Sequence, residues 1–281
     1  MNKQVITSNM VSAFCLYLRN EERSEATIEK YARDISQFAA WLGRRQVTKG
    51  ETVLWKEHLQ SAGYAPGSIN GKLTALDRFF DFSGWKECKV KHLKIQRRLF
   101  RDEGRELTCG EYKRLLAAAR ALGGERLPLL LEAICGTGIR VSEVRYLTVE
   151  AAKAGRAEIA LKGKIRIILI PGKLCRKLLK YARKHKVASG EIFLTRGGQG
   201  LGRKQIWHEM KKLCERAAVA PGKVFPHNLR HLFARTFYQT CRDVAKLADV
   251  LGHSSIETTR IYLISTGTEH ARTLDMLGLV S

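Results

Sequence analysis

Residues 226–262 read PHNLRHLFARTFYQTCRDVAKLADVLGHSSIETTRIY, and this stretch decides how the rest of the chain is interpreted. Proline is well suited to the first position of a helix, so Pro226 predicts a helix that begins there. His227 and Arg230 are three residues apart and therefore share a face of that helix near its positive end. A histidine and an arginine placed in this way are suited to holding an anion.

The second half of the stretch places a histidine between two predicted helices. Gly252 is typical of a residue that ends a helix, and Ser254 with Glu257 has the spacing of a capping box that begins the next one. His253 is thus held at a tight joint, nine residues before Tyr262. Either residue alone is usually a packing residue. Their order along the chain favours a functional interpretation.

A second arginine follows a glycine turn farther upstream, where residues 136–143 read GTGIRVSE. The glycines permit close backbone approach and positive φ angles. Arg140 lies between this turn and a predicted helix that begins near Ser142. Glu143 has two interpretations that the sequence leaves open. It orients Arg140 as a neighbouring carboxylate, or it lies in the first helical turn, where negative charge is favoured.

Two arginines, two histidines and a late tyrosine suit phosphodiester chemistry. A phosphodiester gains negative charge as a fifth oxygen attacks it, so fixed cations and donors aimed at its non-bridging oxygens stabilise that state. Guanidinium groups bind phosphate oxygens in a bidentate manner, which fits Arg140 and Arg230. A free phenol has a pKa of about 10, so attack by Tyr262 requires nearby cations that stabilise its anion.

The charge of the whole chain indicates the same kind of partner. Its 281 residues include 50 Lys and Arg against 27 Asp and Glu, a formal net charge of +23. Such an excess repels itself in a compact state unless a polyanion neutralises it. Nucleic acid is the leading candidate, and a membrane surface is second. The sequence contains no long apolar run and no signal peptide, so we expect neither a membrane-spanning nor a secreted protein.

The seven cysteines are scattered, and no Cys-x-x-Cys pair occurs. An odd count without paired spacing argues against a disulfide framework and against a zinc site. We expect most of these residues to be small buried hydrophobes in a reducing cytoplasm. The sequence has no carboxylate cluster, Cys/His set or glycine-rich nucleotide loop, so we expect no metal and no cofactor.

The first hundred residues have the periodicity of helices. The strongest apolar stripe recurs at intervals of three and four residues and consists of Ile28, Tyr31, Ile35, Phe38 and Leu42. Ser24 begins this helix. A second stripe runs through residues 66–80, and two weaker ones lie around residues 11–18 and 53–59. We therefore expect a four-helix domain over residues 1–88.

A basic segment separates this domain from the next. Residues 86–105 have little sustained periodicity, and their cations include Lys86, Lys89, Lys91, Lys94, Arg97, Arg98 and Arg101. A solvated linker is one interpretation, and a linker that lies against phosphates is the other, which the net charge favours. We place the linker at residues 89–105 and the second domain at residues 106–281.

The second domain is predicted to be mainly α-helical, of the α+β type, with a small antiparallel sheet. Thr108 and Glu111 form a capping box before its first helix. Residues 157–160 and 165–170 predict a β-hairpin, and residues 192–194 a further short strand. The remaining helices are expected at residues 174–184, 203–217, 226–238, 243–251, 255–264 and 268–277.

These motifs resemble those of the tyrosine recombinases, also called phage-type integrases. That family carries Arg, Lys, His-x-x-Arg, His and Tyr in this order, and the matching residues are Arg140, Lys162, His227, Arg230, His253 and Tyr262. Residues 252–262 are similar to the family's signature almost residue for residue. The resemblance covers nearly the whole chain. It implies a helical SAM-like DNA-binding N-terminal domain and a DNA breaking–rejoining catalytic domain.

The resemblance also implies roles for individual residues. Tyr262 is then the nucleophile, which forms a 3′-phosphotyrosine link and frees a 5′-hydroxyl, with no metal ion. In the family, a lysine on a β-hairpin donates a proton to the leaving 5′-oxygen. The turn in LKGKIR, residues 161–166, is shorter than is usual in the family. Lys162 is favoured because it precedes the turn glycine, and Lys164 stays an alternative.

Partners and competing functions follow from the same resemblance. It implies a site-specific recombinase that clamps double-stranded DNA, works as a homo-tetramer on DNA and integrates or excises a mobile element. We expect it in the bacterial cytoplasm with the nucleoid, and an accessory DNA-binding protein stays open. The tail, residues 268–281, is expected to dock on a neighbouring protomer, with its own domain as the alternative. Competing functions are a type IB topoisomerase and a non-catalytic DNA-binding protein on the same fold.

Overall fold

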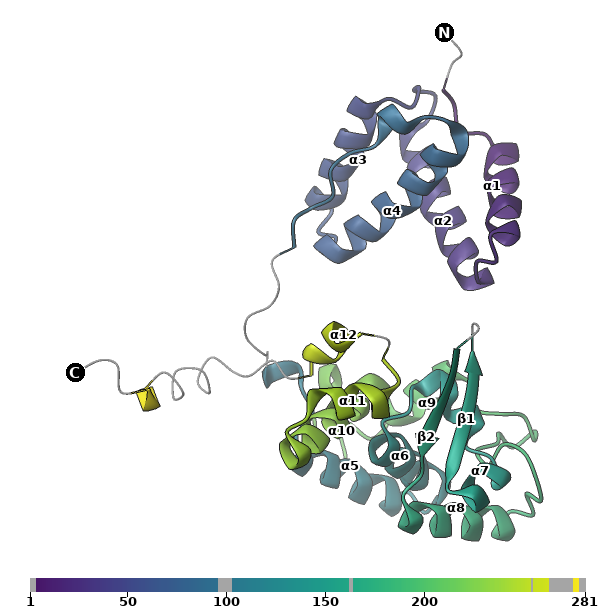
Figure 1. Cartoon of the computed structure of the whole chain (residues 1–281), viewed down its shortest axis with the longest axis vertical. Coiled ribbons are helices and arrows are strands. Elements are labelled where there is room, and N and C mark those ends of the chain that lie inside the picture. The colour runs from purple at the N-terminus through teal and green to yellow at the C-terminus, as the bar shows by residue number, and fades with distance from the viewer. Residues whose placement is uncertain (1–3, 96–102, 162–163, 254, 263–274, 278–281) are drawn as a thin grey trace. The chain divides into compact units, whose positions relative to one another are not determined.

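The protein consists of two compact units, Met1–Arg97 and Arg98–Ser281. The computed structural model describes, as the coloured ribbon of Figure 1, residues 4–95, 103–161, 164–253, 255–262 and 275–277. Each unit has its own hydrophobic core. Within the described residues, no helix combines the length and apolar character that a membrane crossing requires.

The first unit is a bundle of four helices. These are α1 (Ser8–Asn20), α2 (Glu25–Leu42), α3 (Lys49–Ser61) and α4 (Pro66–Ser83), with a 3-10 turn, η1 (Lys86–Cys88), after them. Ser24 is the N-cap of α2 and Pro66 is the first residue of α4, as predicted. Ile35, Phe38 and Leu73 are fully buried in one core, because each helix turns its apolar stripe inward.

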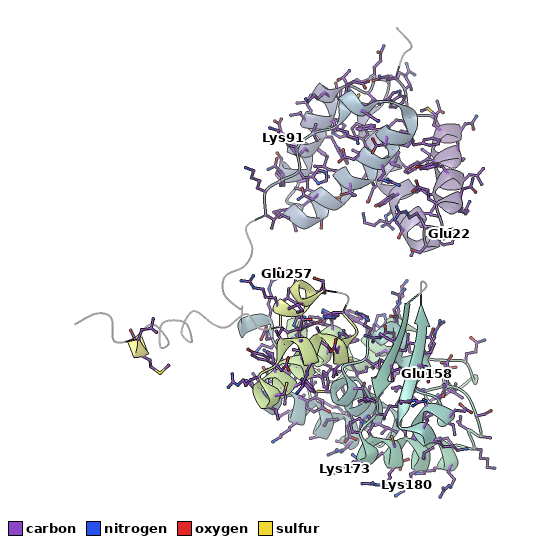
Figure 2. All side chains as sticks on the ribbon, in the orientation of Figure 1. Glu22, Lys91, Glu158, Lys173, Lys180 and Glu257 are labelled. Atoms are coloured by element: carbon purple, nitrogen blue, oxygen red, sulfur yellow. The ribbon has the colours of Figure 1, made fainter. Side chains whose placement is uncertain are left out.

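The start of the basic segment packs onto this bundle. Val90 is buried in the core and Leu93 packs against it. The side chain of Asn70 bonds both backbone groups of Leu93, donating to its carbonyl and accepting from its N–H at 2.9 Å each. Lys91 projects from the surface (Figure 2). Residues 96–102 of the expected linker lie outside the described residues.

The second unit is mainly helical with a two-stranded antiparallel sheet. Its described α-helices are α5 (Cys109–Ala121), α6 (Arg126–Thr137), α7 (Val149–Ala154), α8 (Gly172–Lys184), α9 (Arg203–Lys211), α10 (Pro226–Cys241), α11 (Val244–Leu251) and α12 (Ile256–Arg260). The strands are β1 (Arg156–Leu161) and β2 (Lys164–Leu169). Its 3-10 turns are η2 (Glu103–Arg105), η3 (Val141–Tyr146) and η4 (Pro221–Lys223).

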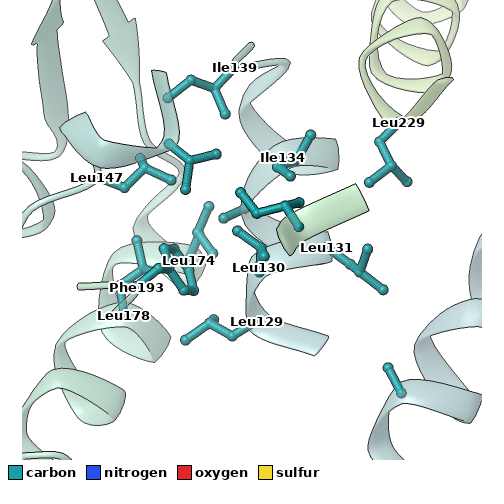
Figure 3. Packing of buried hydrophobic residues seen from close by; sticks show 14 of the residues in the cluster. Leu129, Leu130, Leu131, Ile134, Ile139, Leu147, Leu174, Leu178, Phe193 and Leu229 are labelled. Carbon is teal, nitrogen blue, oxygen red and sulfur yellow. The ribbon is translucent and has the colours of Figure 1, made fainter. Parts of the chain in front are cut away.

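Helix α6 forms the centre of the second core and packs against α5, α8 and α10. Leu130, Leu131 and Ile134 are fully buried there (Figure 3), as expected for a helix surrounded by others. The helix ends at Gly138, whose φ is +63°. A Cβ atom at this position would lie 2.4 Å from Cδ1 of Phe233 on α10, so the close passage of α10 requires a glycine.

The β-hairpin lies along one side of the second unit, and β2 runs towards the start of α8 (Figure 1). Its strands pair antiparallel, from Arg156 opposite Leu169 to Leu161 opposite Lys164. Side chains alternate between the two faces, so Ile168 is 2% exposed whereas Leu169 is 70% exposed. Arg166 lies on the same face as Ile168 and is therefore turned inward.

Two predicted element bounds in the second unit are wrong. The helix predicted at residues 203–217 ends at Lys211, and turns follow it. The guanidinium of Arg114 binds the carbonyls of Ala217 and Ala218, at 2.9 and 3.3 Å, and so holds the end of this segment in a non-helical conformation. The strand predicted at residues 192–194 is replaced by two isolated bridges, which pair Glu191 with Thr148 and Leu194 with Gly200.

The chain around helix α12 also departs from the prediction. The N-cap of α12 is Ser255, whose hydroxyl accepts from the Glu257 N–H at 3.2 Å, one residue later than predicted. Ser254 lies outside the described residues. So does most of the predicted helix at 268–277, of which residues 275–277 are described. The seven cysteines are free thiols, and Cys109 at the start of α5 is exposed.

Candidate active site

Arg230 lies at the centre of the candidate site, although its side chain is 1% exposed. One terminal nitrogen donates to the Gly138 carbonyl, where α6 ends, and Nη2 donates to the Leu251 carbonyl at 2.8 Å. Burial lowers the pKa of this guanidinium, and the nearby Tyr262 hydroxyl partly offsets that effect. Its Nε has no hydrogen-bond partner among the described residues. A buried cation with one unused donor is arranged to receive an anion.

Arg140 precedes the turn η3 and is bound to Glu143. Its backbone N–H and its Nη1 each donate to the Glu143 carboxylate at 3.0 Å. Glu143 is 2% exposed, whereas the Arg140 side chain is 40% exposed. Both interpretations of Glu143 therefore apply, because it lies in the first turn of η3 and also orients Arg140. The predicted helix at this point is a 3-10 turn.

A third arginine, absent from the predicted set, joins the site from strand β2. Arg166 donates to the Glu143 carboxylate and to the Leu251 carbonyl. Burial lowers its pKa to about 10, an effect that Glu143 opposes and the neighbouring arginines reinforce. Glu143 is therefore shared between Arg140 and Arg166, and the Leu251 carbonyl between Arg166 and Arg230. The sequence signal for such a role is an arginine within an otherwise apolar predicted strand, residues 165–170.

His253 has both ring nitrogens engaged. Its Nδ1 lies 2.8 Å from the Thr259 hydroxyl, and its Nε2 lies 2.9 Å from Nη2 of Arg230. A guanidinium only donates, so Nε2 accepts, and Nδ1 carries the proton and donates to Thr259. Burial and, after it, the charges of the nearby arginines lower the pKa of His253 to about 4. The imidazole is therefore neutral near pH 7.

Tyr262 is enclosed by three imidazole rings. It is 5% exposed, and its ring centroid lies 4.6 Å from that of His231, 5.9 Å from His253 and 6.4 Å from His227. Burial lowers the pKa of His231 to about 4 and also lowers that of His227, as does the charge of Arg230. His231 was not predicted, although it lies four residues after His227 and so shares a face of α10 with it.

The charge of this cluster suits a phosphoryl group in transfer. Its three guanidinium groups and the carboxylate of Glu143 leave two positive charges, because the histidines are neutral. A phosphodiester brings one negative charge and gains a second as an oxygen attacks. The cluster is therefore most nearly neutral when the five-coordinate state forms, which is the condition for stabilising it selectively.

The structure gathers Arg140, His227, Arg230, His253 and Tyr262 in one place. Lys162 lies outside the described residues, and Lys164 is described only as the backbone at the start of β2. In the part of the chain that the structure describes, no three His, Cys, Asp or Glu side chains are grouped to hold a metal ion.

Comparison with known protein families and relatives gives matches along nearly the whole chain. The phage integrase family matches residues 105–268, and the phage integrase N-terminal SAM-like domain matches residues 11–87. Tyrosine recombinase XerA of Pyrococcus furiosus is 29% identical, over 93% of this chain and 91% of that protein. Tyrosine recombinase XerC of Roseiflexus castenholzii is 30% identical, over 91% and 88%.

Solved structures share the fold. A lambda integrase tetramer bound to a Holliday junction is similar with a TM-score of 0.75 and 17% identity, over 93% of this chain and 78% of that one. The XerH site-specific recombinase bound to difH gives a TM-score of 0.67 and 20% identity, over 97% and 90%. Identities this low establish the architecture of the chain and not its substrate.

Proposed function

This chain belongs to the phage integrase family and is a tyrosine-type site-specific recombinase, and on that premise we propose that it cuts and rejoins duplex DNA through Tyr262. The observation that carries the proposal is the enclosure of Tyr262 by three neutral imidazoles beside buried Arg230. Its partner is double-stranded DNA, which the formal net charge of +23 attracts.

In the proposed cleavage step, the Tyr262 oxygen attacks the phosphorus and the bond to the 5′-oxygen breaks. A 3′-phosphotyrosine and a free 5′-hydroxyl result, so the bond energy is kept for rejoining. Arg140 and Arg230 bind the non-bridging oxygens, the second through its unused Nε donor. His227, kept neutral by its lowered pKa, accepts the phenolic proton.

The remaining roles concern the second proton and the second histidine. We assign proton donation to the leaving 5′-oxygen to Lys162, with Lys164 as the alternative. His253 accepts from Arg230 through Nε2 when DNA is absent. Once the phosphate occupies the site, the proton lies on Nε2, which donates to a non-bridging oxygen, while Nδ1 accepts from the Thr259 hydroxyl. Side chains of this chain thus supply both the proton acceptor for Tyr262 and the proton donor for the leaving oxygen.

Assembly and biological reaction extend the proposal. Four protomers would exchange strands on DNA. The support for this is that the lambda integrase, whose fold is similar, forms a tetramer on a Holliday junction. The proposed reaction is integration or excision of a mobile element, and an accessory DNA-binding protein stays open. Sequencing the DNA joints that the purified protein makes tests this. Joints between element ends and a target support it, and joints only between two copies of one fixed site contradict it.

A nicked suicide substrate tests the chemistry itself. The wild-type chain should trap a covalent protein–DNA product, and Tyr262→Phe should form none. Gel-shift affinity of the variant should stay within a few-fold, because Lys and Arg contacts with phosphates carry most of the binding. Tyr238→Phe, a matched change on α10, should leave the product unchanged. Covalent product from Tyr262→Phe would show that another residue attacks.

A further inference from the structure

We propose that Arg166 is a positioning residue for DNA cleavage, which keeps Arg140 directed at the phosphate by holding Glu143. The inference rests on the proposed cleavage through Tyr262. It assigns a task to a residue of strand β2 that is neither the nucleophile nor a proton donor. Its side chain is 14% exposed and reaches two other segments of the fold, η3 and the end of α11.

Two arginines share the carboxylate of Glu143. One oxygen of this carboxylate accepts from Nη1 of Arg140 at 3.0 Å, and the other accepts from Arg166 and from the Arg140 N–H. The carboxylate is almost fully buried and must keep its partners, because an unpaired buried charge is costly. Arg166 satisfies that need, so Glu143 engages only one terminal nitrogen of the Arg140 guanidinium.

The consequence of losing Arg166 follows from that sharing. Without Arg166, the Glu143 oxygen that it binds keeps the Arg140 N–H and becomes available to the Arg140 guanidinium, so that Glu143 and Arg140 form a two-pronged pair. Arg140 is then drawn towards η3 and away from the non-bridging oxygens. DNA affinity depends on many phosphate contacts and changes little, whereas the cleavage step loses a cation at the point where charge develops.

The end of helix α11 is the second place where Arg166 acts. The Leu251 carbonyl accepts from Arg166 and also from Arg230, and it carries the partial negative charge of a helix C-terminus. Two residues later, His253 bonds Arg230. Arg166 therefore shares the Leu251 carbonyl with Arg230, which in turn bonds His253.

Single-turnover cleavage of the nicked substrate by the full chain tests the inference. Arg166→Met should lower the cleavage rate by up to about 100-fold, the loss expected when a catalytic group is misplaced by about 1 Å. The dissociation constant for DNA should stay within a few-fold. Arg156→Met, an exposed arginine on the partner strand of the same hairpin, is the matched control and should cleave as the wild type does.

A second pair of variants distinguishes positioning from a general loss of structure. Arg166 acts through Glu143, so Arg166→Met in a Glu143→Gln background should lose much less than Arg166→Met does alone. Arg166→Lys keeps the charge but reaches fewer acceptors, and its rate should fall between those of the wild type and Arg166→Met. A 5′-phosphorothiolate leaving group should not restore the rate of Arg166→Met, because the leaving oxygen is not where the residue acts.

Four outcomes overturn the inference. The first is a wild-type cleavage rate for Arg166→Met, and the second is a loss of DNA affinity by this variant as large as its loss of rate. The third is an equal loss of rate from Arg166→Met in the wild-type and Glu143→Gln backgrounds. The fourth is recovery of the Arg166→Met rate on the phosphorothiolate substrate. Failure of the proposed function has a different signature. In that case the wild-type chain itself forms no covalent product.

Discussion

Gly252 is the position at which a single methyl group should disturb both stability and cleavage. It ends α11 with φ +62° and ψ 47°, a left-handed conformation. A Cβ atom there would lie 2.5 Å from Cδ and 2.7 Å from Nη1 of Arg166. Gly155 ends α7 with φ +71°, and nothing lies within 4 Å of its Cβ position. The two Gly→Ala changes therefore share the backbone cost, and only one displaces a side chain.

The magnitudes follow from that difference. A left-handed alanine costs about 1–2 kcal/mol, which should lower the melting temperature by roughly 2–8 °C for Gly155→Ala. Gly252→Ala also displaces the Arg166 guanidinium from the Leu251 carbonyl, and a hydrogen bond to a charged group contributes about 1.5–3 kcal/mol. The combined loss of about 2.5–5 kcal/mol corresponds to roughly 5–20 °C.

Calorimetry of the DNA-free chain and cleavage of the nicked substrate measure the two effects. Gly252→Ala should melt lower than Gly155→Ala and cleave up to about 100-fold more slowly, whereas Gly155→Ala should cleave within a few-fold of the wild type. In an Arg166→Ala background the clash is gone, so Gly252→Ala should cost only the backbone term. Equal melting temperatures for the two glycine variants, or a full cost that persists without the Arg166 side chain, would refute the reasoning.

Three further outcomes are expected. Lys162→Ala should slow cleavage by roughly 10²- to 10⁴-fold, and a 5′-phosphorothiolate leaving group should restore it; rescue of Lys164→Ala instead would reverse the assignment. The pKa values of His231 and His253 are lowered to about 4, so the unfolded chain takes up protons first as the pH falls below about 6.5. Thermal stability should therefore fall between about pH 6.5 and 4, and a double His→Gln variant that keeps the full slope would contradict this. Neutralising the linker cations should reduce the log–log salt slope of DNA binding by about 0.9 per lost contact, and an unchanged slope would mean that they face solvent; the residues to change to Gln are Lys91, Lys94, Arg97 and Arg98.

The sequence predicted the elements whose periodicity is strong and whose ends are marked. Helices α2 and α4 begin where Ser24 and Pro66 indicate, and α10 begins at Pro226. The hairpin was predicted, but its inward face was not, because residues 165–170 are apolar at nearly every position. Ile167 and Leu169 face solvent, and a charged residue takes the buried side. Such an inversion depends on tertiary contacts that no local pattern contains.

The sequence also did not indicate which side chains contact the predicted site residues. The role of Thr259 is visible only in the folded chain, where α12 brings the Thr259 hydroxyl into hydrogen-bond contact with His253. His231 follows Arg230 directly, and its part in enclosing Tyr262 depends on the approach of a segment from thirty residues farther along the chain. The turns that replace the predicted end of α9 likewise include carbonyls, at Ala217 and Ala218, that Arg114 from a distant helix binds.

The two uncompensated positive charges of the site have a practical consequence for work in solution. When no DNA is bound, this cluster of guanidinium groups, with its unused Nε donor, can bind a tetrahedral oxyanion from the buffer. Phosphate and sulfate should therefore compete with the scissile group for occupancy, beyond their contribution to ionic strength. Rates measured in phosphate buffer would then include displacement of a bound buffer ion. Chloride solutions of matched ionic strength would report the reaction without this step.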